Sequence, residues 1–145
     1  MSYQIITDSC SDFTEAQLQQ WNVSCVNLTL RYHNENHSNF SDPAAVKAFY
    51  DEVRNGTMAT TAAANPSDWA EAMQPVLEAG QDVLVITFSS GLSTTYQSAV
   101  IAANELQEQY PQRKIHVVDT LCAALGEGLL VWHACRHRDA GMSLE

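Results

Sequence analysis

The segment from Asp82 to Phe88, DVLVITF, is almost entirely apolar, which narrows the folds that this chain can adopt. A strand with one face in water alternates between apolar and polar residues, whereas a strand of a parallel sheet is buried on both faces and shows little alternation. The segment Lys114–Val118, KIHVV, is interpreted as a second buried strand. The pattern therefore predicts a parallel sheet that is covered by helices on both sides.

The other segments alternate between strand and helix signals. Two more strands are expected at Tyr3–Thr7 and Val23–Tyr32, and the polar residues after Tyr32 predict a loop with a short returning strand. Helices are expected at about 14–21, 43–55, 66–78, 93–110 and 123–139, with Pro75 kinking or shortening the third. This order predicts one α/β domain over residues 1–145, with a mainly parallel sheet and helices on both faces.

The charge balance excludes several classes of partner. Seven Lys and Arg face seventeen Asp and Glu, for a formal net charge of -10. A nucleic-acid binder needs a basic surface, so nucleic acid is not an expected partner. No apolar run is long enough to span a bilayer, and the start MSYQIITDSC lacks the features of a signal peptide. The default prediction is a cytoplasmic protein.

Neither the cysteines nor the histidines form a recognisable metal site. The four cysteines contain no C-x-x-C pair, so they are interpreted as reduced, mostly packed thiols; they are Cys10, Cys25, Cys122 and Cys135. His133 and His137 lie four residues apart on the last expected helix, but no third ligand is evident. We therefore expect neither a metal nor a cofactor.

Three expected strands end in small polar residues: Asp8-Ser9, Ser89-Ser90 and Asp119-Thr120. In open parallel sheets, ligands bind outside the carboxyl ends of the strands, so these residues mark the edge of a candidate site. Asp, Ser and Thr also cap the helices that follow strands. Both interpretations stay open for each corner.

The corner SSGLSTT, residues 89–95, lacks the patterns of two common sites. It has neither a phosphate-binding G-x-x-x-x-G-K-[ST] nor a G-x-S-x-G nucleophile motif. Gly126-Glu127-Gly128 is a G-x-G, but it lies in an apolar helical pattern without the third glycine. Nucleotide binding and acyl-enzyme chemistry are both disfavoured.

The same corner suits an anion that is bound without chemistry. A helix is expected to begin between Ser93 and Tyr96, where its first N–H groups are unpaired and its dipole is positive. Gly91 permits close approach of a ligand, and hydroxyl groups add donors at Ser90, Ser93, Thr94 and Thr95. These features predict a neutral cradle for a carboxylate or phosphate oxygen.

Four segments resemble the DegV family, in family order and over nearly the whole chain. They are TDSCSDFT (7–14), ATTAAANPSDW (59–69), VLVITFSSGLSTTYQSA (83–99) and VVDTLCAALGEGLLV (117–131). The resemblance implies a non-catalytic protein that binds a long-chain fatty acid between two domains. In some members this protein is the carrier subunit of a bacterial fatty acid kinase. It also implies a fold related to the substrate-binding subunit of dihydroxyacetone kinase.

The resemblance also assigns roles to particular residues. Thr61 matches the threonine that holds the fatty acid carboxylate, and Ser93 matches the second hydroxyl ligand. Backbone N–H groups near Ser93 and Thr94 complete the cradle. Residues expected to line the cleft are Asp8, Ser9, Ser90, Gly91 and Asp119.

The chain departs from the family pattern at several positions. Where the family continues its double threonine with Ser-Gln-Pro-Ser, this chain has Ala62, Ala63, Ala64 and Asn65. Cys10 and Ala124 replace hydroxyl residues that are frequent in the family. Several polar contacts around the cleft are therefore expected to be missing.

The resemblance covers the N-terminal domain only, and we expect a C-terminal domain that this chain lacks. After Gly141, Ser143 is interpreted as the N-cap of another helix, with Glu145 in its first turn. Two alternatives remain at this point. One is an enzyme for a small acyl or phosphorylated substrate that uses Asp8 and Asp119 as acid, base or metal ligands. The other is a domain that folds but binds nothing, because half of the cleft is absent.

Overall fold

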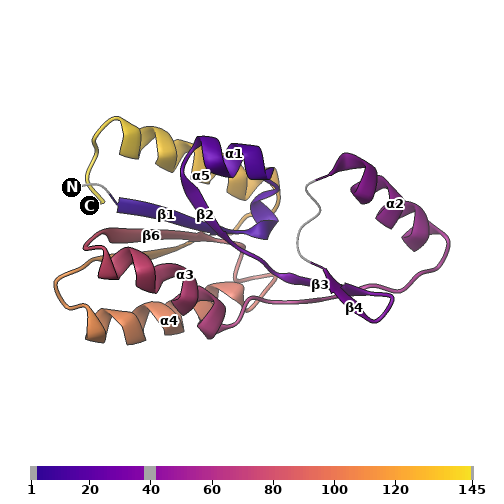
Figure 1. Ribbon diagram of the computed structural model, residues 1–145, viewed down its shortest axis with the longest axis horizontal. Coiled ribbons are helices and arrows are strands. Elements are labelled where there is room, and N and C mark those ends of the chain that lie inside the picture. Colours follow the sequence, from indigo (N-terminus) through magenta and orange to yellow (C-terminus); the bar gives the residue numbers. More distant parts are fainter. Residues whose placement is uncertain (1–2, 38–41, 145) are drawn as a thin grey trace.

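The computed structural model describes residues 3–37 and 42–144, and its centre is a parallel sheet (Figure 1). The strand order is β2-β1-β6-β7, and each neighbouring pair is parallel. The strands are β1 (Tyr3–Asp8), β2 (Val23–Val26), β6 (Asp82–Thr87) and β7 (Ile115–Asp119). The predicted α/β fold with a mainly parallel sheet is confirmed.

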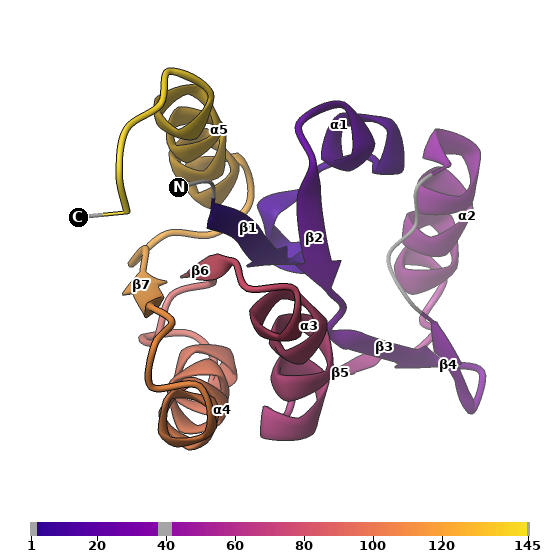
Figure 2. The same cartoon turned by 60° about the vertical axis from the view of Figure 1, so that its left-hand side comes forward.

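Helices cover both faces of this sheet, as predicted (Figure 2). On one face lie α1 (Glu15–Gln20) and α5 (Leu125–Asp139), and on the other lie α3 (Pro66–Glu78) and α4 (Thr95–Gln109). A short 3-10 turn, η1 (Ser9–Ser11), connects β1 to the loop before α1. This turn places residues 9–14 at the carboxyl end of the sheet.

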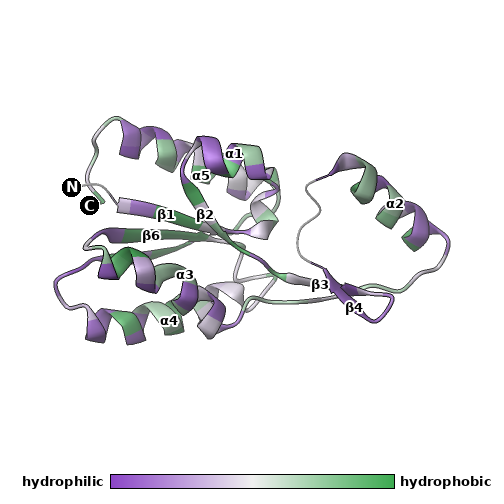
Figure 3. Ribbon diagram, viewed as in Figure 1, coloured by the Kyte–Doolittle hydropathy of each residue, from purple (hydrophilic) through white to green (hydrophobic). Residues whose placement is uncertain are grey.

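The apolar run of residues 82–88 is buried on both faces. Val83 and Val85 of β6 pack with Trp69 and Met73 of α3 in one cluster, whereas Ile86 belongs to a second cluster on the α5 side. Figure 3 shows β6 as hydrophobic along most of its length. Because both faces of β6 are covered, the strand has no polar alternation.

A second region stands beside the central sheet (Figure 1). It is an antiparallel sheet of order β4-β3-β5 together with α2 (Pro43–Arg54). The strands are β3 (Thr29–Tyr32), β4 (Glu35–His37) and β5 (Thr60–Ala62). The returning strand that was predicted after Tyr32 is β4. His33 and Asn34 form the hairpin turn with φ of 52° and 61°, the left-handed region that a two-residue hairpin requires.

Three sequence predictions are corrected. The single strand expected over 23–32 is two strands in different sheets, because the chain leaves the parallel sheet after Val26 and the Leu28 N–H donates to Ser9 Oγ at 3.0 Å. No strand was expected at residues 60–62, where the structure has β5. The strand β7 is an edge strand, so His116 and Val118 are exposed rather than buried.

The helix ends follow their capping residues. Asp42 caps α2 by accepting a hydrogen bond from the Ala44 N–H at 3.1 Å, a role that aspartate favours at a helix start. Gly56 follows α2 with φ of 97°, a conformation that glycine adopts readily. The predicted helix start at Ser143 is not observed in residues 142–144, and Glu145 lies outside the described residues.

Candidate functional site

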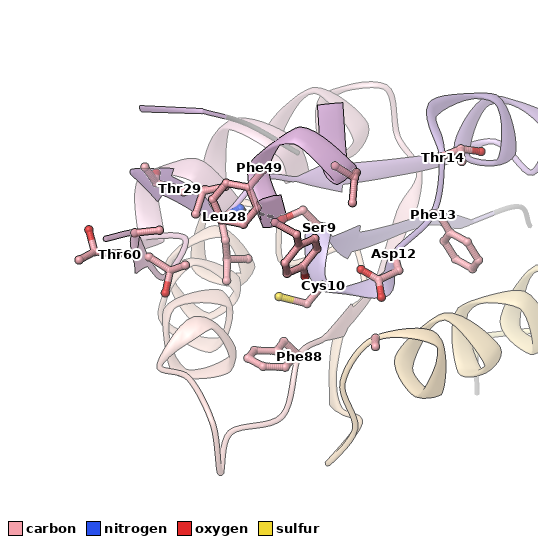
Figure 4. Close-up of a pocket in the computed structure, with 16 residues that line it drawn as sticks. Ser9, Cys10, Asp12, Phe13, Thr14, Leu28, Thr29, Phe49, Thr60 and Phe88 are labelled. Atoms are coloured by element: carbon pink, nitrogen blue, oxygen red, sulfur yellow. Dashed lines mark hydrogen bonds between the residues drawn. The ribbon is translucent and has the colours of Figure 1, made fainter. Parts of the chain in front are cut away.

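A cavity of about 1080 Å³ lies between the two regions of the chain. One wall comes from residues 9–14 after β1, with Phe88 at the end of β6. The other comes from β3, β5 and α2, which contribute Leu30, Thr61 and Phe49. In Figure 4, Thr60 lies at one end of the cavity, and Phe13 and Thr14 lie at the other. The volume is slightly above the usual range for small-molecule pockets.

The cavity wall combines apolar surface with neutral hydroxyl groups. Its large apolar side chains are Phe13, Leu28, Leu30, Val46, Phe49 and Phe88. Its hydroxyl groups come from serine, threonine and tyrosine, including Ser9, Thr14, Thr29, Thr60 and Thr61. Among the described residues that line it there is no Lys or Arg, and one carboxyl group, Asp12, is present. Such a wall accepts a long apolar ligand with a small polar end.

The negative charge in the wall lies at one end of the cavity. Asp12 follows η1, and burial raises the pKa of its carboxyl above the ordinary value. In Figure 4 it lies on the side of Phe13 and Thr14, away from Thr60. An anionic head group is therefore repelled from the Asp12 end and favoured at the threonine end.

Asp8 joins two loops rather than facing the cavity. Its side chain is fully buried, and its two oxygens accept hydrogen bonds from the Cys10 N–H at 2.9 Å and the Phe88 N–H at 2.8 Å. Burial raises the pKa of this carboxyl, and the two backbone N–H groups act in the opposite direction. With both oxygens occupied and buried, Asp8 fixes loop geometry and does not touch a ligand in the cavity.

Asp119, at the end of β7, also binds backbone N–H groups of neighbouring loops. Its Oδ1 accepts hydrogen bonds from the N–H groups of Ser90 and Leu121, each at 3.1 Å. The hydrogen bonds from Ser90 lower the pKa of the Asp119 carboxyl below its ordinary value. Asp119 therefore remains ionised and ties the β7 end to the serine-rich corner.

The serine-rich corner is a turn built on Ser89. The Ser89 carbonyl accepts from the N–H groups of Leu92 at 3.0 Å and Ser93 at 3.1 Å, and Ser89 Oγ accepts from Gly91 at 3.2 Å. Ser93 Oγ is hydrogen-bonded to Thr95 Oγ1 at 2.7 Å and accepts from the Thr95 N–H at 3.2 Å. Two N–H groups that were expected to be open, those of Ser93 and Thr95, are thus already paired.

Part of the predicted cradle is open at the start of α4. The N–H groups of Thr94, Tyr96 and Gln97 make no hydrogen bond within the part of the chain that the structure describes. Thr94 is exposed and occupies the N-cap position without a side-chain cap. These donors and the helix dipole still provide a site for an anion.

The structure separates the predicted site residues into two groups. Thr61 and Ser9 line the cavity, and Thr61 is exposed in the middle of β5, opposite Leu30. Outside the cavity wall lie Asp8, Ser90, Gly91, Ser93, Thr94 and Asp119. The roles of Thr61, Ser93 and Thr94 in holding a carboxylate stay predictions.

Sequence reasoning missed the contribution of α2 and of one buried acid. Val46, Phe49 and Tyr50 of α2 line the cavity, and their helical spacing gave the only signal. Glu127 is fully buried in the first turn of α5, where acidic residues are usually exposed. Glu127 lies between Gly126 and Gly128, and nothing in this local sequence indicates that its side chain is buried.

The described residues contain no group of three His, Cys, Asp or Glu side chains arranged to hold a metal. The rings of His133 and His137 are stacked, with centroids 6.5 Å apart.

All four cysteines are free thiols, as predicted. None of the helices in residues 3–37 and 42–144 has the length and apolar character to cross a membrane.

Comparison with known proteins identifies the family. The DegV family model matches residues 2–145. The chain belongs to the DegV family. A DegV domain-containing protein of Clostridium perfringens is 35% identical over 142 residues, which cover 97% of this chain and 49% of that protein. The chain therefore spans about half the length of the curated relatives that it matches.

Solved structures show the same DegV fold. One, described by the words "Fatty Acid Binding of a DegV family Protein from Thermus thermophilus", is 32% identical, with a TM-score of 0.85 over 99% of this chain and 50% of that one. Another is the fatty acid kinase (Fak) B3 protein of Streptococcus pneumoniae loaded with linoleic acid, with 24% identity and a TM-score of 0.79 over 99% of this chain and 50% of that one. At that identity the second likeness supports the fold alone.

These findings do not favour the enzyme alternative. The Thermus thermophilus DegV structure is described by binding and not by catalysis. In this chain, Asp8 is buried with both oxygens paired to backbone N–H groups, so it cannot reach a substrate.

Proposed function

We propose that this DegV chain binds a long-chain fatty acid through its carboxylate and serves as a carrier for acyl phosphorylation by a partner kinase. The observation that carries the proposal is the cavity of about 1080 Å³, whose wall is apolar with neutral hydroxyl groups. An acyl chain matches the apolar wall, because burying each CH₂ group contributes about 0.8 kcal/mol. The kinase partner and a cytoplasmic location are part of this proposal and rest on the family resemblance.

The carboxylate is assigned to the end of the cavity that carries Thr61. Thr61 lines the cavity and offers a hydroxyl donor next to Thr60 in β5, and Figure 4 shows Thr60 away from Asp12, whose charge disfavours a second negative charge at its own end. Ser93, the open N–H groups near Thr94 and the α4 dipole complete the cradle in this proposal. A neutral cradle of this kind holds an anion by hydrogen bonds without a lysine or arginine.

A second domain is proposed to close the cavity. The chain covers about half of its relatives, and apolar side chains beside the carboxyl end of the sheet are exposed, namely Leu121 at 73%, Leu125 at 67% and Leu129 at 55%. Leu125 and Leu129 are four residues apart and therefore share one face of α5, and an exposed apolar face of this kind marks a surface that another protein element covers. The test is to titrate oleic acid into this chain and into a DegV chain that carries both halves. The longer chain is expected to bind more tightly, and equal affinities would contradict the proposed closure of the cavity by a second domain.

Native mass spectrometry of the delipidated protein with oleic acid tests the proposed function. The expected result is one bound acid, and at least tenfold weaker binding of methyl oleate, which has the same tail but no charged carboxylate. Equal binding of the two compounds would contradict carboxylate recognition. Absence of binding to a chain with both halves would contradict the proposal as a whole.

A further inference from the structure

Two acids, Asp8 and Glu127, are fully buried next to the strand end that leads into the cavity wall: Asp8 accepts a hydrogen bond from the N–H of Cys10, and Glu127 is bound to Thr7. Glu127 Oε1 accepts a hydrogen bond from the Thr7 hydroxyl at 2.9 Å, whereas Glu127 Oε2 has no partner among the described residues. Asp8, in contrast, has a backbone donor on each oxygen. The buried pair therefore has one carboxyl suited to negative charge, Asp8, and one that is not, Glu127.

The groups that face Glu127 do not compensate a negative charge on it. Asp8 ends β1, Cys10 and Asp12 belong to the following turn, and Cys25 lies on β2. All of these are acidic groups, and no Lys, Arg or His acts on Glu127 in the described part of the chain. Burial, and next the charge of Asp8, raise the pKa of Glu127 to about 8, against smaller opposing effects of the Thr7 hydroxyl and the Asp8 N–H.

Glu127 is mechanically connected to the cavity. Asp8 holds the N–H of Cys10, and Cys10 lines the cavity. The next residue of α5, Gly128, packs so closely on η1 that a Cβ atom there would be 2.7 Å from the Ser11 carbonyl oxygen. Since α5 and η1 are in backbone contact, a new charge on Glu127 cannot be relieved without moving the turn that forms the cavity wall.

We propose that Glu127 is a positioning residue for the ligand site, which holds a proton beside ionised Asp8 and keeps η1 in place against the cavity. The inference rests on the proposed function, because the ligand is the fatty acid assigned above. When Glu127 releases its proton to solvent at alkaline pH, two negative charges share one buried site and repel. Ligand affinity then falls because η1 loses its position.

The test compares the protein with its Glu127→Gln variant. Glutamine has the shape of the protonated acid and does not ionise. The measurement is the affinity for oleic acid between about pH 6 and about pH 9.5, reported as the ratio of the two proteins, so that ionisation of the ligand cancels. The affinity of the wild type divided by that of Glu127→Gln is expected to be near one at the acidic end of this range. At the alkaline end this ratio is expected to be about tenfold lower. A constant ratio would overturn the inference.

A surface control and a stability measurement complete the test. The Glu71→Gln variant removes an exposed acid from α3 and is expected to follow the wild-type pH profile. Glu127 has an ordinary pKa of 4.5 and one of about 8 in the fold, so the folded state holds an extra proton between these values. Stability therefore declines as pH rises through this window and is level above it, whereas Glu127→Gln lacks this decline.

These measurements also separate the two proposals. Absence of oleic acid binding in both proteins at every pH would contradict the proposed function, and the stability profile would still show whether Glu127 holds a proton. If the variant fails to fold, ¹³C NMR of glutamate carboxyl groups in the wild type replaces it. A glutamate that titrates near pH 8 supports the inference, and titration of every glutamate near the ordinary value overturns it.

Discussion

The central sheet and the antiparallel region are stabilised by different means. Every buried apolar side chain of the described residues belongs to one of the two clusters that pack on the faces of the central sheet. In the antiparallel region, α2 has no buried residue, and all three residues of β5 are exposed. Its contacts include strand hydrogen bonds, the side-chain pair of His33 and Glu52, and aromatic pairs such as Tyr32 with Phe49, whose ring centroids are 5.1 Å apart.

Because of this difference, the central sheet mainly stabilises the fold, whereas the antiparallel region mainly supplies side chains to the cavity. The central sheet buries most of its apolar residues against its own helices, and only a few, such as Phe13 and Phe88, reach the cavity wall. The antiparallel region leaves Val46 and Phe49 to line the cavity. Substitutions in the first region are therefore expected to lower stability, and those in the second to lower affinity.

The largest expected effect is on stability in the central sheet. Trp69 is fully buried in α3, so Trp69→Ala is expected to lower the free energy of unfolding by about 3–5 kcal/mol. The matched change in the antiparallel region, Phe49→Ala, removes a half-buried ring and is expected to cost about 1 kcal/mol. Urea denaturation of both variants measures the difference. Equal losses would show that the two regions are not stabilised differently.

The contact between α5 and η1 gives the next effect. A Cβ atom at Gly128 would be 2.7 Å from the Ser11 carbonyl oxygen, so Gly128→Ala is expected to lower stability by about 1–3 kcal/mol. Gly126→Ala is the control, because its Cβ would meet only Cys122 at an ordinary 3.4 Å. Thermal unfolding of the two variants tests this. A Gly128→Ala protein as stable as Gly126→Ala would show that η1 moves freely.

An intermediate effect is expected on affinity alone. Thr61→Val removes the hydroxyl from an exposed position of β5 and keeps the shape of the side chain. We expect about tenfold weaker binding of oleic acid, about 1.4 kcal/mol, with little change in stability. Thr57→Val, in the connection before β5 and outside the cavity wall, is the control. Unchanged affinity in Thr61→Val would remove Thr61 from the carboxylate site.

The smallest expected effect tests the orientation of the ligand. Asp12→Asn removes the carboxyl group from the cavity wall, and we expect affinity for oleic acid to rise only about two- to threefold, because the carboxylate lies at the other end. Isothermal titration calorimetry measures the change. A rise well above tenfold would place the carboxylate beside Asp12 instead.

The sequence predicted the central sheet more closely than the antiparallel region, for a physical reason. Residues 82–88 are apolar because both faces of β6 are covered, and burial of this kind leaves a pattern in the sequence. Strand β5 has three residues and no buried side chain, so it leaves no such pattern. The break between β2 and β3 depends on a hydrogen bond from Leu28 to Ser9, which no local signal indicates.

The site was predicted in the same uneven way. The polar strand ends were correctly placed at the carboxyl edge of the sheet, but Asp8 and Asp119 bind backbone N–H groups there. Ser93 keeps its predicted position before α4, with a hydroxyl paired to Thr95. The burial of Glu127 results from the packing of α5 on η1, which joins residues that are far apart in the chain. The relationship to the dihydroxyacetone kinase subunit stays a prediction.

The most direct test of the central claim is paramagnetic NMR with a stearic acid that carries a spin label near its methyl end. If the acyl chain occupies the cavity, amide signals must broaden in both regions, in α2 around Phe49 and in the turn that carries Cys10. Residues on the outer face of α3, such as Glu71, are expected to keep sharp signals. Broadening that is absent from both cavity walls, or that is equal over the whole chain, would show that the acyl chain does not lie in this cavity.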